Sequence, residues 1–251
     1  MRRPRTITAA CMALGLSAAA NAELVSLQAV ADATLYESAT GNAANGAGQY
    51  LFAGRTNQNL ARRALLRFDV ATTLPQGVEI VSARLVLHVS QANGGNRNVS
   101  LHRVTTAWTT GASDPDLTES TGAAPLAGDA TWLHASFDPF GASALWQNAG
   151  GDFLAAASAV TLTTTAGLQT WESAGLLADV RAFAAQGGAN LGWILLGDES
   201  AAGTARRFDS ADSAALGGIV PRLEIEYTTV PAPGSIALLA LAGIVLRRRR
   251  R

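Results

Sequence analysis

The stretch from Ser82 to Ser90 reads SARLVLHVS, and the character of its side chains alternates. The residues with odd numbers are all apolar, whereas the residues between them include an arginine and a histidine. Because successive side chains of a β-strand point to opposite faces of a sheet, this period of two predicts a strand with one buried face. Leu85 and Leu87 are expected on the buried face.

The same alternation recurs elsewhere in the chain. In the stretch PRLEIEYTT (221–229) Ile225 is expected on an inward face, and in RRALLRFDV (62–70) Phe68 is expected there. The run LGWILLG (191–197) is apolar on both faces, so Trp193 is expected in the core. The stretch SAGLLADVRAFAAQGG (173–188) has its apolar residues at helical spacing. Seven or more strands and one short helix predict an all-β fold, a two-sheet β-sandwich of the jelly-roll type.

Charge divides the chain into a body and two ends. The sequence carries 19 basic and 19 acidic residues, and all of the basic ones are arginines. Eight of these arginines lie within the first five or the last five residues, so residues 23–229 have a net charge of −8. A net-negative body is a poor ligand for nucleic acid, which selects basic patches. The absence of lysine also excludes a P-loop lysine and a Schiff-base lysine.

The first 22 residues have the layout of a signal peptide. Arg2, Arg3 and Arg5 precede an apolar stretch, and Ala20-Asn21-Ala22 provides a cleavage site of the A-x-A kind. We expect export and a mature chain that begins at Glu23. The single cysteine lies within these 22 residues, so residues 23–229 must be stabilised by an apolar core and not by disulfide bonds.

The last segment reads VPAPGSIALLALAGIVLRRRRR (230–251). Its apolar run of eleven residues would cover roughly 16 Å as a helix, about half of the hydrocarbon thickness of a bilayer. A Pro-x-Pro motif, a short apolar run and an arginine cluster resemble the PEP-CTERM sorting signal, although the middle residue is Ala232 where the family has Glu. The resemblance implies a transient membrane anchor and cleavage by an exosortase-type processing enzyme. The expected division is therefore a signal peptide (1–22), a β-sandwich domain (23–229) and a sorting signal (230–251).

The ordered pieces of the body resemble a DNRLRE-domain protein. They include ADATLYE (31–37), RRALLRFDV (62–70), VSLHRVTTAWTTG (99–111), GDATWLHASFD (128–138), ANLGWILLGDE (189–199), ARRFDS (205–210) and PRLEIEY (221–227). The group consists of exported bacterial β-sandwich proteins related to a carbohydrate-binding module and to disaggregatase-related repeats. The chain departs from the group late in the domain, where a Ser-Arg-Glu stretch is replaced by Ser210-Ala211-Asp212.

Tryptophans beside polar or glycine-rich residues are the first candidates for ligand contact. An exposed indole could stack on a sugar ring, and Trp132 is the first choice because Asp129 and His134 lie close enough in sequence to bind sugar hydroxyls. Trp108 and Trp146 are further candidates. The alternative is that these large aromatic side chains plug the ends of the sandwich.

Acidic loops are the candidates for metal binding. Asp198, Glu199, Asp209 and Asp212 could supply oxygen ligands to Ca²⁺, although the spacing of an EF-hand is absent and solvated loops are the alternative. No other cofactor is indicated.

The sequence contains neither HExxH nor GxSxG, and its three histidines are far apart. We therefore expect an exported, non-catalytic domain at the cell surface or outside the cell, which binds extracellular polysaccharide or acts in adhesion. An enzyme acting on such a polysaccharide, as hydrolase or lyase, and a structural component of a surface layer or matrix are the alternatives. The implied partners are a glycan, an exosortase-type enzyme, the export machinery and, transiently, the membrane.

Overall fold

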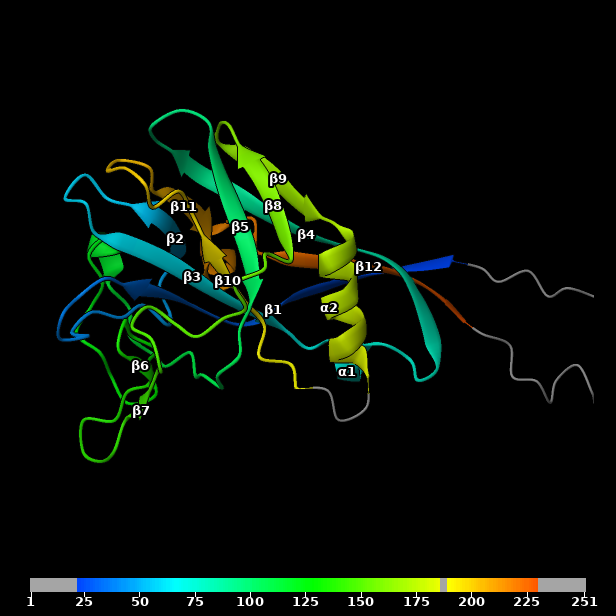
Figure 1. Cartoon of the computed structure of the whole chain (residues 1–251), viewed down its shortest axis with the longest axis horizontal. Helices are drawn as coiled ribbons and strands as arrows, with labels where there is room; N and C mark the ends of the chain where they lie inside the picture. Colours follow the sequence, from blue (N-terminus) through cyan, green and yellow to red (C-terminus); the bar gives the residue numbers. More distant parts are fainter. Residues whose placement is uncertain (1–21, 186–188, 230–251) are drawn as a thin grey trace, which may run out of the picture.

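The computed structural model describes residues 22–185 and 189–229 (Figure 1). The expected signal peptide and sorting signal fall outside these residues, apart from Ala22. Within the described ranges, no helix has both the length and the apolar character needed to cross a membrane.

The described chain is built mainly of strands, with two α-helices and two short 3₁₀ turns. The strands are β1 (Ala22–Tyr36), β2 (Tyr50–Arg55), β3 (Ala61–Phe68), β4 (Val78–Ala92), β5 (Arg97–Arg103), β6 (His134–Ser136), β7 (Ala144–Leu145), β8 (Ala159–Thr163), β9 (Gly167–Glu172), β10 (Trp193–Leu196), β11 (Arg206–Asp209) and β12 (Arg222–Thr229). The helices are α1 (Val70–Thr73) and α2 (Ala174–Ala184), and the 3₁₀ turns are η1 (Asp116–Thr118) and η2 (Asp212–Leu216).

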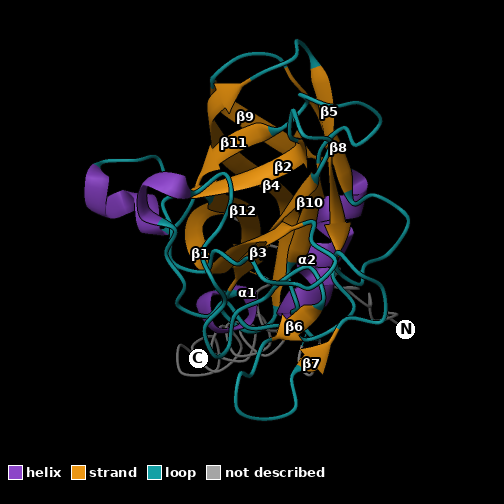
Figure 2. Ribbon diagram, turned by 90° about the vertical axis from the view of Figure 1, so that its left-hand side faces the viewer, coloured by secondary structure: helices purple, strands orange, loops and turns teal. Residues whose placement is uncertain are grey.

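Two antiparallel sheets, which the pairing of β2 with β3 joins into one continuous sheet, face each other across the core (Figure 2). The first, here called the β4 sheet, contains β1, β12, β4, β11 and β2, and β9 pairs with the other edge of β4. The second, called the β3 sheet, contains β1, β3, β10, β5 and β8. β1 belongs to both sheets, because residues 22–28 pair with β12 and residues 29–36 pair with β3 across a register shift. The expected all-β sandwich is confirmed.

The core between the sheets contains the side chains that the alternation placed there. Phe68, Leu85, Leu87, Trp193 and Ile225 are each at most 1% exposed, so the expected strand faces are confirmed. The predicted helix forms as α2 and lies against this core. Its N-cap is Ser173, whose hydroxyl accepts the N–H of Leu176, and its buried face presents Phe183 to the Trp193 ring at 4.9 Å between ring centroids.

A second apolar cluster lies on the outer face of the β3 sheet. Leu65 and Ile194 point to this side, and the long segment between β5 and β8 folds over them. This explains why the run 191–197 is apolar on both faces: alternate residues of β10 enter different clusters. The segment also carries the β6–β7 hairpin, which projects from the sandwich in Figure 1.

Candidate functional site

The tryptophans proposed as stacking platforms are buried. Trp108, Trp132 and Trp146 are 2%, 9% and 6% exposed and belong to the second apolar cluster. Nε1 of Trp108 donates to the carbonyl of Leu191 at 2.8 Å, and Nε1 of Trp146 donates to the carbonyl of Thr131 at 2.9 Å. The expectation of exposed rings is therefore wrong. The polar residues beside them in sequence indicate loops, but these loops cover an apolar sheet face that needs large side chains to fill it.

Trp132 is enclosed from two directions. The guanidinium of Arg63 lies 4.9 Å from the centre of its ring, held there by a bidentate ion pair with Glu199 at 2.8 and 3.0 Å. Gly150 passes over the ring with φ of +88°, and a Cβ at this position would lie 2.8 Å from the indole. Glycine is required here, because both the backbone conformation and the available space exclude a side chain.

Asp129 and His134 form hydrogen bonds within the segment between β5 and β8. Asp129 is fully buried, and its carboxylate accepts the backbone N–H groups of Ala112, Ser113 and Leu126. His134 is half-buried; its Nδ1 lies 2.8 Å from the Thr131 hydroxyl, and burial lowers its pKa. Neither residue is presented to a ligand together with an open indole face, so the expected cluster of Trp132, Asp129 and His134 is not an open site.

The four acidic metal candidates do not converge. Asp198 pairs with Arg97 at 2.9 Å, whereas the carboxylate of Glu199 is engaged by Arg63. Asp209 lies 2.8 Å from Nδ1 of His88, and burial together with the charge of Asp114 raises the pKa of Asp212. Among residues 22–185 and 189–229, no group of three or more His, Cys, Asp or Glu side chains could hold a metal ion. Binding of Ca²⁺ stays a prediction.

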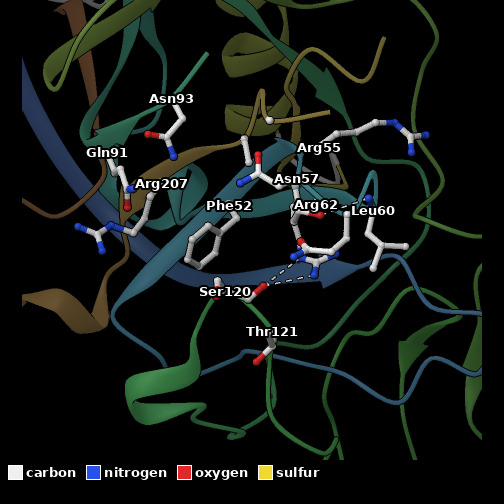
Figure 3. Close-up of a pocket in the computed structure, with 14 residues that line it drawn as sticks. Phe52, Arg55, Asn57, Leu60, Arg62, Gln91, Asn93, Ser120, Thr121 and Arg207 are labelled. Atoms are coloured by element: carbon white, nitrogen blue, oxygen red, sulfur yellow. Dashed lines mark hydrogen bonds between the residues drawn. The ribbon is translucent and has the colours of Figure 1, made fainter. Parts of the chain in front are cut away.

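An open groove lies on the outer face of the β4 sheet, where β2 and β11 pair, and has a volume of about 620 Å³ (Figure 3). Its floor and walls come from β2, the β2–β3 turn, the start of β3, the end of β4, the residues after η1, the loop before β11, and β11 itself. The lining residues are Phe52, Arg55, Thr56, Asn57, Gln58, Leu60, Arg62, Gln91, Asn93, Ser120, Thr121, Gly203, Ala205 and Arg207. Three of these are arginines and none is acidic, although the body as a whole is net negative.

Arg207 is the arginine best placed to meet an anion. It pairs in register with Phe52 across β11 and β2, and its guanidinium lies 4.0 Å from the centre of the Tyr50 ring. Nε donates to the Ser90 hydroxyl at 3.0 Å, and no acidic group of the described residues forms an ion pair with it. The stacked arrangement fixes the planar fork, so little side-chain freedom remains to be lost when a carboxylate binds.

The other two arginines support the walls of the groove. Arg62 donates to the carbonyl of Ser120 at 3.3 Å, as the dashed lines in Figure 3 mark, and lies 4.7 Å from the centre of the Tyr36 ring. Its burial lowers its pKa. Arg55 donates to backbone carbonyls and meets Glu37 at 3.5 Å. Both add positive charge to the groove while holding its rim.

The groove arginines were missed at the sequence level, although one signal for them was present. Arg206 and Arg207 are consecutive, and in a strand consecutive side chains point to opposite faces. One of the pair therefore had to enter the core and the other had to stand on the outer face; Arg206 is fully buried and Arg207 is partly exposed. The contributions of the β2–β3 turn and of the residues after η1 depend on tertiary packing and had no local signal.

Residues 23–134 match the family model of carbohydrate-binding module family 96. This match supports a carbohydrate-binding, non-catalytic domain. Phe52, Arg55 and Arg62 lie within the matched residues, whereas Arg207 lies beyond them. No curated protein matches the chain.

Proposed function

We propose that residues 23–229 form a non-catalytic module that binds a negatively charged extracellular polysaccharide in the groove between β2 and β11. The observation that carries the proposal is the lining of this groove: three arginines, no acid, and several neutral hydrogen-bonding side chains. Sugar hydroxyls suit the amide groups of Asn57, Gln91 and Asn93, and a carboxylate or sulfate suits the guanidinium of Arg207.

The proposed location of the module, outside the cell, rests on the sequence. The signal-peptide layout and the resemblance to DNRLRE-domain proteins and PEP-CTERM signals support export and display at the cell surface, where adhesion would follow from glycan binding. An exosortase-type enzyme and the export machinery are the processing partners in this proposal. The match to a carbohydrate-binding family supports the module and not the route by which it reaches the surface.

The histidines offer no reason to prefer the enzyme alternative. None of His88, His102 and His134 lines the groove. His88 is paired with Asp209, and both ring nitrogens of His102 have partners, the carbonyl of Leu154 and the hydroxyl of Ser100, each at 2.9 Å. The proposed module therefore binds without cleaving, and a reducing-end assay with the same polysaccharide should yield no product.

The test is calorimetric titration of residues 23–229 with polyglucuronate and with a neutral dextran, at low and at high salt. We expect binding of polyglucuronate, weaker binding at high salt, and a loss of about tenfold in Arg207→Gln, since a charge-assisted hydrogen bond is removed. Arg84→Gln is the matched control, because Arg84 pairs with Glu224 on β12, outside the groove lining. Equal losses in the two variants, or equal affinity for dextran, would contradict the proposal.

A further inference from the structure

The groove continues into a second hollow of about 350 Å³. The two hollows share four lining residues: Phe52, Gln91, Ser120 and Arg207. Beyond these, the second hollow is lined by Gln49, Tyr50, Asp116 and Glu119. The charged residues that line only one of the two hollows differ in sign. Arg55 and Arg62 line only the groove, whereas the carboxyl groups of Asp116 and Glu119 line only the second hollow.

The two carboxyl groups differ in how they are used. Glu119 accepts the backbone N–H groups of Gln49 at 2.9 Å and Tyr50 at 2.7 Å, so its charge is engaged in holding the turn η1 against β2. Asp116 is exposed, and no arginine or histidine of the described residues forms an ion pair with it. Asp116 therefore keeps a carboxylate available in a hollow that Arg207 also lines.

This arrangement selects a ligand with two charges of opposite sign. A guanidinium fork matches a carboxylate, whereas a free aspartate carboxylate matches an ammonium group. A polysaccharide with acid groups alone would place one of them beside Asp116, where like charges repel. A polysaccharide with amino groups alone would place positive charges beside the three arginines, where like charges also repel.

We propose that the groove recognises a mixed-charge glycan, in which a carboxylated sugar at Arg207 is followed by a sugar with a free amino group at Asp116. This inference rests on the proposed function and narrows the class of its ligand. Arg207 lies between the two hollows and contacts the carboxylate, and Asp116 distinguishes the neighbouring sugar by the charge of its nitrogen substituent.

The test compares two forms of one polymer, heparosan, in which glucuronate alternates with N-acetylglucosamine. Chemical N-deacetylation converts the neutral acetamides to ammonium groups and leaves the carboxylates unchanged. We expect the wild-type domain to bind the deacetylated form about threefold to fivefold more tightly at low salt, the range of an exposed ion pair. Asp116→Asn should abolish this preference. Glu79→Gln, with the same charge change at the opposite end of β4, should leave the preference intact.

The outcomes separate this inference from the proposed function. Equal or weaker binding of the deacetylated polymer by the wild type, which needs no variant, would overturn the mixed-charge inference while polyglucuronate binding remained. Retention of the preference in Asp116→Asn would also overturn it. Failure to bind polyglucuronate and both forms of heparosan would remove the proposed function and this inference with it.

Discussion

Asp32 on β1 is a buried acid that makes the stability of the fold depend on pH. Its side chain lies inside the sandwich, where Oδ2 accepts the N–H of Ala211 at 2.7 Å. Burial raises the pKa of Asp32 to about 7, the Ala211 hydrogen bond lowers it in part, and the charge of Asp212 raises it further. In the folded protein the carboxyl group is therefore protonated at pH values where the unfolded chain has already lost the proton.

The sign of the pH dependence follows from this difference. The stabilising contribution of protonated Asp32 is complete below about pH 4, the value for an unfolded aspartate, and is lost as the pH rises towards 7. Asp32→Asn keeps an oxygen to accept the Ala211 N–H and removes the titration. Between pH 4 and pH 8, we expect the free energy of unfolding of the wild type to fall by on the order of 1–4 kcal/mol relative to that of the variant. Denaturant unfolding at each pH measures this difference. Parallel pH profiles for the two proteins would contradict the account.

Trp132 gives a second prediction at the scale of the residue. Because its ring is enclosed by Arg63 and Gly150, Trp132→Ala should cost about 3–5 kcal/mol of unfolding free energy through a cavity and lost contacts. Trp132→Phe, which fills part of the space, should cost less. A loss under 1 kcal/mol in the alanine variant, measured by denaturant unfolding, would return the ring to the surface and revive a role in sugar stacking.

At the scale of elements, Arg206 joins the ends of several strands. Its guanidinium is fully buried and donates to the carbonyls of Asn93 and Gly95 after β4 and to the Thr163 hydroxyl on β8. It has no carboxylate partner among the described residues, so its charge is satisfied by backbone carbonyls and the Thr163 hydroxyl. Since Asn93 also lines the groove, this contact fixes part of the groove rim.

Replacing Arg206 by Met removes these donors and leaves buried carbonyls unsatisfied. We expect Arg206→Met to lose about 3 kcal/mol or more of unfolding free energy, because each unsatisfied buried group costs about 1–3 kcal/mol. Hydrogen exchange should rise first in residues 93–96. Arg207→Met is the matched control. Because the Arg207 side chain is partly exposed, its replacement should lower the free energy of unfolding by less than about 1 kcal/mol. Similar losses in both variants would show that Arg206 does not hold the rim.

The elements that could be predicted from sequence are those with one clear period. The alternation in 82–90 and 221–229 defined β4 and β12 and their inward faces, and the helical spacing of Leu176, Val180 and Phe183 defined α2. The segment between β5 and β8 could not be predicted in this way. Its tryptophans are buried by long-range packing on the β3 sheet, and local polarity gave the opposite indication. The groove was missed for the same reason, since its walls come from four separate stretches of the chain, 52–62, 91–93, 120–121 and 203–207.

At the scale of the whole molecule, the groove and the ends of the domain lie far apart. Ala22 pairs with Thr228, and Thr229 pairs with Val78 at the start of β4. The other end of β4, Ala92, pairs with Arg206 beside the groove. Fifteen residues of extended strand separate the two ends of β4, which corresponds to roughly 45 Å. In Figure 1, β1 and β12 leave the sandwich on the right, whereas β2 and β11 lie on the left.

This geometry suits a domain that is tethered through residues 230–251. If the tether holds the chain at a membrane, even transiently, the groove stands away from that surface and remains open to a polymer outside the cell. Attachment near β2 or β11 would instead hide the groove. The proposed sorting signal and the proposed binding function are therefore compatible in one molecule.

The proposed signals at the two ends of the chain predict where the mature protein begins and ends. An apolar run of eleven residues covers only roughly half of a bilayer as a helix, which supports the proposal that a processing enzyme cuts the chain near the Pro-Ala-Pro motif. Mass spectrometry of protein recovered from the cell exterior should find a chain that starts at Glu23 and ends between Val230 and Gly234. Replacing Arg247–Arg251 by serines should block this cleavage, whereas the same replacement at Arg222 on β12 should leave it intact. Recovery of wild-type chains that still carry the arginine cluster from the exterior would refute the processing proposal, and glycan binding by residues 23–229 would then have to be explained without a sorting step.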